Sequence, residues 1–362
     1  MKWRTNLGDL VGAREGVTFA FLVIVFTVFT VLSPYFYGVL NFSFIFTDSI
    51  EIGLIALTMT MVMVMGEIDL SVGSIVGLSG AMLGDLSSHG VPFVAAIFLA
   101  LLTGLVAGLI NGMLCIKFQL PSLVVTLGTF ALYRGVAELL IGANTIVNFP
   151  SWFLGWDTHY VIGYVTYPQL FWLGCTLVAI VVLHRLRFGR QVTFIGANAR
   201  AALFAGIRVN RYKLVMFGAS GLMSAMASLI LVSRLQSLDN TAGIGFELVV
   251  ITAVLLGGTD YRGGHGTVIG TFLAVLLVGA VENGLGLLNV SSQVTTATVG
   301  ILLIVSILVD LATKKAQIKL LRSRRDRSTA SPLAPPSRGT DLSTRDVSQN
   351  IKGEHTKSNN SV

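Results

Sequence analysis

Long apolar runs separated by short polar segments dominate the first 312 residues of the chain. An α-helix needs about 20 such residues to cross a bilayer. The pattern predicts ten helical segments, near residues 17–34, 48–66, 71–86, 92–115, 122–141, 166–184, 213–234, 246–257, 267–288 and 294–312. The segment 246–257 is too short to cross alone, so we interpret it as a half-helix or re-entrant piece that needs surrounding protein or a cavity.

The basic residues between these runs alternate from side to side. With a cytoplasmic N-terminus, the inner segments are 1–16, 67–70, 116–121, 185–212, 258–266 and the C-terminal tail. Twelve of the fourteen Lys and Arg residues before residue 314 lie in or beside them: Lys2, Arg4, Arg14, Lys117, Arg185, Arg187, Arg190, Arg200, Arg208, Arg211, Lys213 and Arg262. The outer loops, 35–47, 87–91, 142–165, 235–245 and 289–293, contain none. This positive-inside pattern predicts that both termini are cytoplasmic.

Two arginines lie inside predicted spans. Arg134 precedes Glu138 by four residues, a separation that places both side chains on one helix face, where they can pair. Such a pair is either a functional group or a structural link between packed helices. Arg234 lies at the outer end of its span, where its side chain can reach toward the surface.

Composition excludes a large soluble enzyme. Hydrophobic residues make up 53% of the chain and charged residues 12%, with a mean hydropathy of +0.78, whereas soluble domains carry roughly 25% charged residues. So few charges cannot cover a water-facing surface.

The net charge of +7 comes from the tail. Residues 1–313 contain fourteen basic and fourteen acidic residues, and residues 314–362 contain eleven and four. Because this excess follows a membrane span, we assign it to topology and contact with anionic lipid, not to nucleic acid. We therefore divide the chain into a cytoplasmic N-terminus (1–16), a transmembrane domain (17–313) and a basic tail (314–362). The tail is rich in Ser, Thr, Asn, Arg and Pro from Ser323 on, and we expect it to be disordered.

No motif in the chain supplies chemistry or energy. The sequence has no G-x-x-x-x-G-K-[ST] phosphate loop, no metal-ligand spacing and no credible nucleophile motif. His265 is a single histidine beside a membrane turn. We therefore predict a non-enzyme without a cofactor of its own, whose energy source is another chain.

The longest inner loop, 185–212, contains one short helix signal. Asn198 is placed to cap it, Ala199 to Ala205 are good helix formers, and Gly206 is a stop. We expect a small helix between two flexible joints. Its small side chains suit docking into the groove of a partner. The alternative is that the loop is only a connector whose basic residues fix its cytoplasmic location.

Two inner turns are rich in glycine. In the first, from Met65 to Ser74, Asp69 is placed to cap the following helix, and Gly73 begins a series of small residues that allow close helix approach. The second runs from Gly257 to Thr267. Both read as tight turns between closely packed helices.

The stretch Glu67-Ile-Asp-Leu-Ser-Val-Gly-Ser74 resembles the signature of permease subunits of ribose-, xylose- and rhamnose-type ABC importers, a group that includes autoinducer-2 permeases. Further similar stretches are Pro121-Ser-Leu-Val-Val-Thr-Leu-Gly-Thr129, Gly189-Arg190 through Asn198, Ala201-Ala202 with Gly206-Ile207, Gly257-Gly258 through Thr267, and Asn283-Gly284-Leu285 with Val290-Ser291-Ser292. They cover about residues 17–312 in order. The chain departs from the family at Met65-Gly66-Glu67, where a Gly-Gly-rich lead-in is more usual, and in its long tail.

The resemblance implies a multi-pass permease of the bacterial inner membrane that pairs with a second copy or a sibling. It implies a separate cytoplasmic ATPase that binds ATP and Mg, and an external solute-binding protein. The implied ATPase-docking residues are Asn198, Arg200, Ala201, Ala202, Gly206, Ile207 and Arg208. The implied signature turns contain Asp69, Ser71, Gly73, Gly257, Gly258, Gly263 and Gly264. For the solute pathway we select Asn111, Phe130 and Asn283.

Three alternatives remain at this point. A secondary transporter would need intramembrane ionisable groups, and Asp48, Glu51 and Glu282 are the candidates besides Arg134 and Glu138. An ABC permease for branched-chain amino acids shares the architecture, although the Asp69 signature favours the sugar branch. A membrane scaffold would not need the glycine-rich hairpins.

Overall fold

The computed structural model describes residues 13–142, 145–156 and 159–308. The helices in these ranges are α2 (Ala13–Leu32), α3 (Val39–Asp48), α4 (Ile50–Val64), α5 (Val72–Ser88), α6 (Phe93–Phe118), α7 (Ser122–Ile141), α8 (Tyr167–His184), α9 (Arg187–Ala197), α10 (Ala199–Phe204), α11 (Val209–Leu235), α12 (Phe246–Leu256), α13 (Val268–Leu287) and Ser292–Leu308. A small antiparallel hairpin, β1 (Tyr160–Ile162) and β2 (Val165–Thr166), precedes α8. The predicted tail from residue 314 lies outside the described residues.

Six single helices are long and apolar enough to cross a membrane, namely α2, α6, α7, α8, α11 and α13. The pair α3 and α4 passes the same test together and bends by 49° at its break. This confirms an all-helical polytopic membrane protein, the class in which each backbone polar group is satisfied within its own span. The helices α5 and α12 contain 17 and 11 residues, fewer than the roughly 20 that a crossing helix needs. The count of ten crossings therefore remains a prediction.

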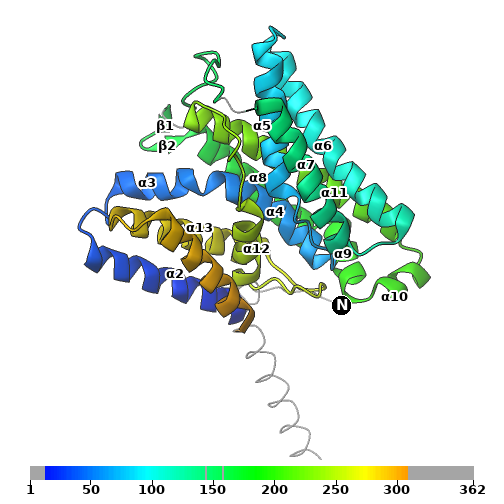
Figure 1. Cartoon of the computed structure of the whole chain (residues 1–362). Helices are drawn as coiled ribbons and strands as arrows, with labels where there is room; N and C mark the ends of the chain where they lie inside the picture. Colours follow the sequence, from blue (N-terminus) through cyan, green and yellow to red (C-terminus); the bar gives the residue numbers. More distant parts are fainter. Residues whose placement is uncertain (1–12, 143–144, 157–158, 309–362) are drawn as a thin grey trace, which may run out of the picture. The chain divides into compact units, whose positions relative to one another are not determined.

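Helix α11 is the centre of one helical group and packs against α4, α5 and α6 (Figure 1). Its first turns lie beside the end of α4, where Lys213 forms an ion pair with Glu67. Its last turn lies beside the start of α4, where Arg234 binds Glu51. The two helices are therefore antiparallel. We call the end that contains Lys213 the basic end of the helices, and the opposite end the far end.

A second group consists of α2, α3 and α13 (Figure 1). Close approach explains two glycines of α13: a Cβ at Gly284 would overlap the Phe29 ring of α2, and one at Gly279 would overlap the Ser49 hydroxyl at the α3–α4 break. The threonines Thr60 and Thr271 hydrogen-bond each other over 2.8 Å, which joins α4 to the start of α13.

The segment that leads into α12 is not helical. Its residues follow α5 from the far end toward the basic end: Leu238 lies beside Gly80, the Ala242 carbonyl beside Gly77, and the Gly243 carbonyl beside Gly73. This non-helical approach, followed by an 11-residue helix, agrees with the predicted half-helix. Surrounding protein makes it tolerable in a membrane.

Arg134 holds this segment, which corrects the predicted pairing. Its guanidinium donates to the carbonyl oxygens of Ala242 at 3.0 Å and Asn240 at 3.4 Å. Within the described part of the chain there is no ion pair between Arg134 and Glu138. The non-helical backbone leaves carbonyls without a partner in their own segment, and a nearby arginine satisfies them.

Glycines set the distance between α6 and α11. A Cβ at Gly108 would overlap the Phe217 carbonyl oxygen, and one at Gly221 would overlap the Gly104 carbonyl oxygen. Gly128 on α7, by contrast, has no atom within 4 Å of an added Cβ.

We predict that Gly108→Ala lowers the free energy of unfolding by about 1–3 kcal/mol, because the helix backbones must separate to admit a methyl group. The matched variant Gly128→Ala should be neutral or stabilising, because alanine favours a helix over glycine. Thermal unfolding of both purified proteins in one detergent measures the difference. Equal melting temperatures would contradict the α6–α11 contact.

Candidate functional site

The inner loop 185–212 forms two helices, α9 and α10, at the basic end. The predicted short helix is present: the Asn198 side-chain oxygen accepts from the Ala201 backbone at 3.0 Å, and α10 ends at Phe204 with Gly206 at φ +79°. The predicted flexible joint before it is instead helix α9. This helix has buried Gly189, Val192 and Ile195 on one face, an amphipathic pattern that we did not predict.

The predicted docking residues differ in burial. Ala202 is fully buried and Ile207 is packed against the main core, so these two anchor the loop. Ala201 is half-buried, and the exposed ones are Asn198, Arg200, Gly206 and Arg208. The most exposed apolar residues of the loop were not predicted: Leu203 is 59% exposed and Phe204 is 93% exposed. Two large apolar residues in the last turn before a helix-stopping glycine, Leu203-Phe204-Ala205-Gly206, were the signal for them.

Backbones from three segments meet beneath this loop. The Gly264 amide donates to the Val64 carbonyl at 2.7 Å, which joins the second glycine turn to the end of α4. A Cβ at Gly196 on α9 would overlap that same carbonyl, and one at Gly263 would lie 2.8 Å from Gly66. We call Gly66, Gly196, Gly263 and Gly264 the glycine junction. At Gly196, Gly263 and Gly264 an added side chain would press on a neighbouring backbone, whereas Gly66 has room for a Cβ. Gly66, Gly263 and Gly264 have positive φ, which favours glycine.

Packing or backbone conformation also accounts for Gly257 and Gly258 in this turn. A Cβ at Gly257 would lie 2.5 Å from the Thr271 amide of α13, and Gly258 has φ +87°.

Asp69 forms a buried polar centre at the turn between α4 and α5. Its carboxylate accepts from the Ser71 amide at 3.0 Å, the Ser71 hydroxyl at 2.6 Å and the Ser220 hydroxyl of α11 at 2.9 Å. The prediction that Asp69 caps α5 is wrong: Ser71 is the N-cap residue, with no side-chain cap bond, and Asp69 stabilises the turn before it. Burial raises the pKa of the Asp69 carboxyl, and its hydroxyl donors oppose that rise.

This centre continues through Asn111, which is fully buried. The Asn111 amide donates to the Ser71 hydroxyl at 2.7 Å, and the Tyr133 hydroxyl donates to the Asn111 oxygen at 3.1 Å. The network thus joins the α4–α5 turn to α6, α7 and α11. Asn111 therefore lies in the packed interior, and its assignment to the solute pathway stays a prediction.

A cavity of 770 Å³ with several charged residues in its otherwise largely apolar lining lies toward the far end, between α12, α13, the helix Ser292–Leu308 and the ends of α3, α4 and α11. We call it the far-end cavity. The predicted pathway residue Asn283 lines it, whereas the half-buried Phe130 of α7 does not. Its charged lining residues are Asp48, Glu51, Arg234 and Glu282.

Arg234 joins both sides of the α3–α4 break at this cavity. Its Nη1 lies 2.9 Å from Asp48, the last residue of α3, and its Nε lies 2.9 Å from Glu51 in the first turn of α4. Glu51 is only 1% exposed, so the pair offsets a buried charge. The sequence predicted only that the Arg234 side chain reaches toward the surface. Its pairing with Glu51 was not predictable from spacing, because the two residues are more than 180 positions apart.

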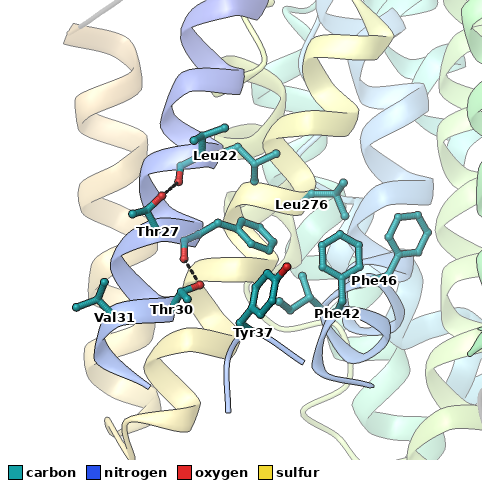
Figure 2. Close-up of a pocket in the computed structure, with 11 residues that line it drawn as sticks. Leu22, Thr27, Thr30, Val31, Tyr37, Phe42, Phe46 and Leu276 are labelled. Atoms are coloured by element: carbon teal, nitrogen blue, oxygen red, sulfur yellow. Dashed lines mark hydrogen bonds between the residues drawn. The ribbon is translucent and has the colours of Figure 1, made fainter. Parts of the chain in front are cut away.

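A second hollow, of 450 Å³ between α2, α3 and α13, is apolar. Figure 2 shows Phe42, Phe46, Leu22 and Leu276 around it. The Thr27 and Thr30 hydroxyls there donate to carbonyls of their own helix, at 2.8 and 2.7 Å. Apart from these two threonines and Tyr37, which is 84% exposed, the lining residues are apolar, so this hollow offers a hydrophilic solute few polar partners.

Comparison with known proteins now decides the family. A family model described as "Branched-chain amino acid transport system / permease component" matches residues 41–307. The chain belongs to this permease family. It is 40% identical over 313 residues to the Autoinducer 2 import system permease protein LsrD of Escherichia coli (strain K12) and of Shigella flexneri, which covers 84% of this chain and 94% of each relative. No solved structure matches the chain.

Family membership makes the chain a permease subunit of an ABC importer and a multi-pass protein of the bacterial inner membrane. Its relatives are transport subunits, and permeases of this family work with an ATPase and a solute-binding protein. The secondary-transporter alternative is not favoured.

The permease offers a matched pair of aspartates for testing the buried network. Asp239 makes the same local turn as Asp69, accepting from the Thr241 amide at 2.8 Å and hydroxyl at 2.6 Å, but it is exposed. We predict that Asp69→Ala lowers the free energy of unfolding by about 1–3 kcal/mol or more, because buried hydroxyls lose their acceptor. Asp239→Ala should change it little, because water replaces the carboxylate. Thermal unfolding in detergent compares the two, and equal losses would refute a special role for the buried network.

Proposed function

We propose that this permease carries a sugar-like solute of the autoinducer-2 kind into the cell, by alternating access driven by a separate ATPase. The similarity to autoinducer-2 permeases over 84% of the chain is the observation that carries the proposal. The alternative solute class is branched-chain amino acids, which the description of the family model names.

The ATPase docks on α9 and α10 in this proposal. The exposed Phe204 and Leu203 supply an apolar tip, and the exposed Arg200 and Arg208 of the same loop add positive charge. An exposed aromatic residue with a polar rim is typical of the centre of a protein–protein interface. Asn198 and Gly206 hold the ends of α10, and Ala202 and Ile207 anchor it to the core.

The glycine junction gives this docking surface a path to the membrane helices. Helix α9 contacts α4 directly at Gly196 and Val64. Helix α4 extends from there to the far-end cavity, where Glu51 binds Arg234. A displacement of α9 by the ATPase would therefore move α4 and reshape the cavity, because packed backbones without side chains between them cannot slide independently.

The remaining assignments follow from this function. Both termini and the docking loop face the cytoplasm, and the far end faces the external solute-binding protein. A second permease copy or a sibling completes the pathway. ATP and Mg bind to the ATPase, and this chain holds no cofactor and binds no nucleic acid.

Reconstitution tests the proposal. The permease, its partner permease, the ATPase and the binding protein encoded beside it would be placed in liposomes and assayed for ATP hydrolysis and solute uptake. We expect uptake of autoinducer-2 or d-ribose that depends on ATP and on the binding protein. Uptake of leucine instead would favour the amino-acid class, and uptake driven by an ion gradient without ATP would overturn the proposal.

The docking surface has its own test. We expect Phe204→Ala to reduce copurification of the ATPase and ATP-driven uptake by about 10-fold or more, because a truncated interface anchor costs roughly 2 kcal/mol. Tyr37→Ala is the matched control, since Tyr37 is 84% exposed and lies between α2 and α3, away from α10. Equal ATPase binding by both variants would place the docking surface elsewhere.

A further inference from the structure

The far-end cavity contains charges that lipid would not tolerate. Asp48, Glu51 and Glu282 all contribute to its lining. A carboxylate facing hydrocarbon is strongly unfavourable, so such residues face a water-filled cavity or a partner within the membrane. The cavity therefore holds water or a polar solute.

Among these carboxylates, Glu282 differs from the other two. Asp48 and Glu51 are both bound to Arg234. In the described ranges, Glu282 has no hydrogen bond and no ion pair, although it lies half-buried on α13. Its carboxylate can accept several hydrogen bonds, and none of them is satisfied by protein.

The neighbouring Asn283 supplies the complementary groups. Its side-chain oxygen accepts from the Asn41 amide at 3.0 Å, which fixes its orientation and leaves its own NH₂ group as a donor. An unsatisfied acceptor and an available donor thus lie next to each other on one cavity wall.

We propose that the far-end cavity binds an uncharged, polyhydroxylated solute, with Glu282 accepting from its hydroxyl groups and Asn283 donating to it. This inference rests on the proposed function and names the residues and the solute class. The charged lining residues, three carboxylates and one guanidinium, carry a formal charge of −2. A phosphorylated or carboxylated solute is therefore repelled, whereas hydroxyl groups donate to carboxylates. The volume of 770 Å³ falls in the range of about 300–1,000 Å³ typical of small-molecule sites.

Protection of an introduced cysteine tests this binding directly. Thr296→Cys places a thiol on the cavity wall, and the full importer complex in liposomes is labelled from the far side with a water-soluble maleimide. The native Cys115 is buried, and a complex without the introduced cysteine corrects for any labelling of Cys115 and Cys175. We expect saturating d-ribose or autoinducer-2 to slow the labelling several-fold, and ribose 5-phosphate to have no effect.

Adding Glu282→Gln to the Thr296→Cys complex should remove the protection and lower ATP-driven uptake about 10-fold, because one charge-assisted hydrogen bond is lost. Adding Glu138→Gln, which changes an exposed carboxylate of α7 outside the cavity, should preserve both. Protection that survives Glu282→Gln, that ribose 5-phosphate also gives, or that only sodium ions give would overturn the inference. If the unmodified complex showed protection but no ATP-driven uptake, solute binding in the far-end cavity would stand and the importer function would be refuted.

Discussion

Opposite charges hold the antiparallel pair α4 and α11 together at both ends, and the other helices are arranged around that pair. Lys213 binds Glu67 at the basic end, and Arg234 binds Glu51 and Asp48 at the far end. Between them, Asp69 accepts from Ser220 of α11. The side chains of Glu51 and Glu67 are 1% and 13% exposed, so each carboxylate would be costly in this interior without its partner. The relative position of α4 and α11 is therefore strongly restricted, and both sites proposed above are built on it.

The two ends of this pair have different chemistry. At the basic end, glycine backbones of α9, the second glycine turn and the end of α4 are in direct contact, so a movement of one segment displaces the others. At the far end, charged and polar side chains form part of the lining of a cavity. Helix α4 is buried along its whole length between these ends. Helix α4 thus connects the proposed ATPase-docking surface on α9 and α10 with the far-end cavity.

Local features were predictable from the sequence, and long-range partners were not. Apolar run lengths predicted the all-helical class, and the Asn198 cap with Gly206 predicted α10, because both depend on neighbours in the chain. Asp69, Arg134 and Asn111 received wrong or incomplete roles. Asp69 bonds to a residue 151 positions away, and Arg134 to carbonyls 106 and 108 positions away. Sequence spacing suggested a helix cap and an i,i+4 pair, and tertiary contacts replaced both.

The most direct test is the amount of solute imported per ATP hydrolysed by the reconstituted complex with Gly196→Ala, compared with Gly174→Ala. A Cβ at Gly196 would overlap the Val64 carbonyl, whereas one at Gly174 has no atom within 4 Å. If the glycine junction transmits movement from the ATPase to α4, Gly196→Ala should still bind and hydrolyse ATP through its docked ATPase but import several-fold less solute per ATP. Gly174→Ala should match the unmodified complex. An unchanged ratio in Gly196→Ala would contradict transmission through this junction.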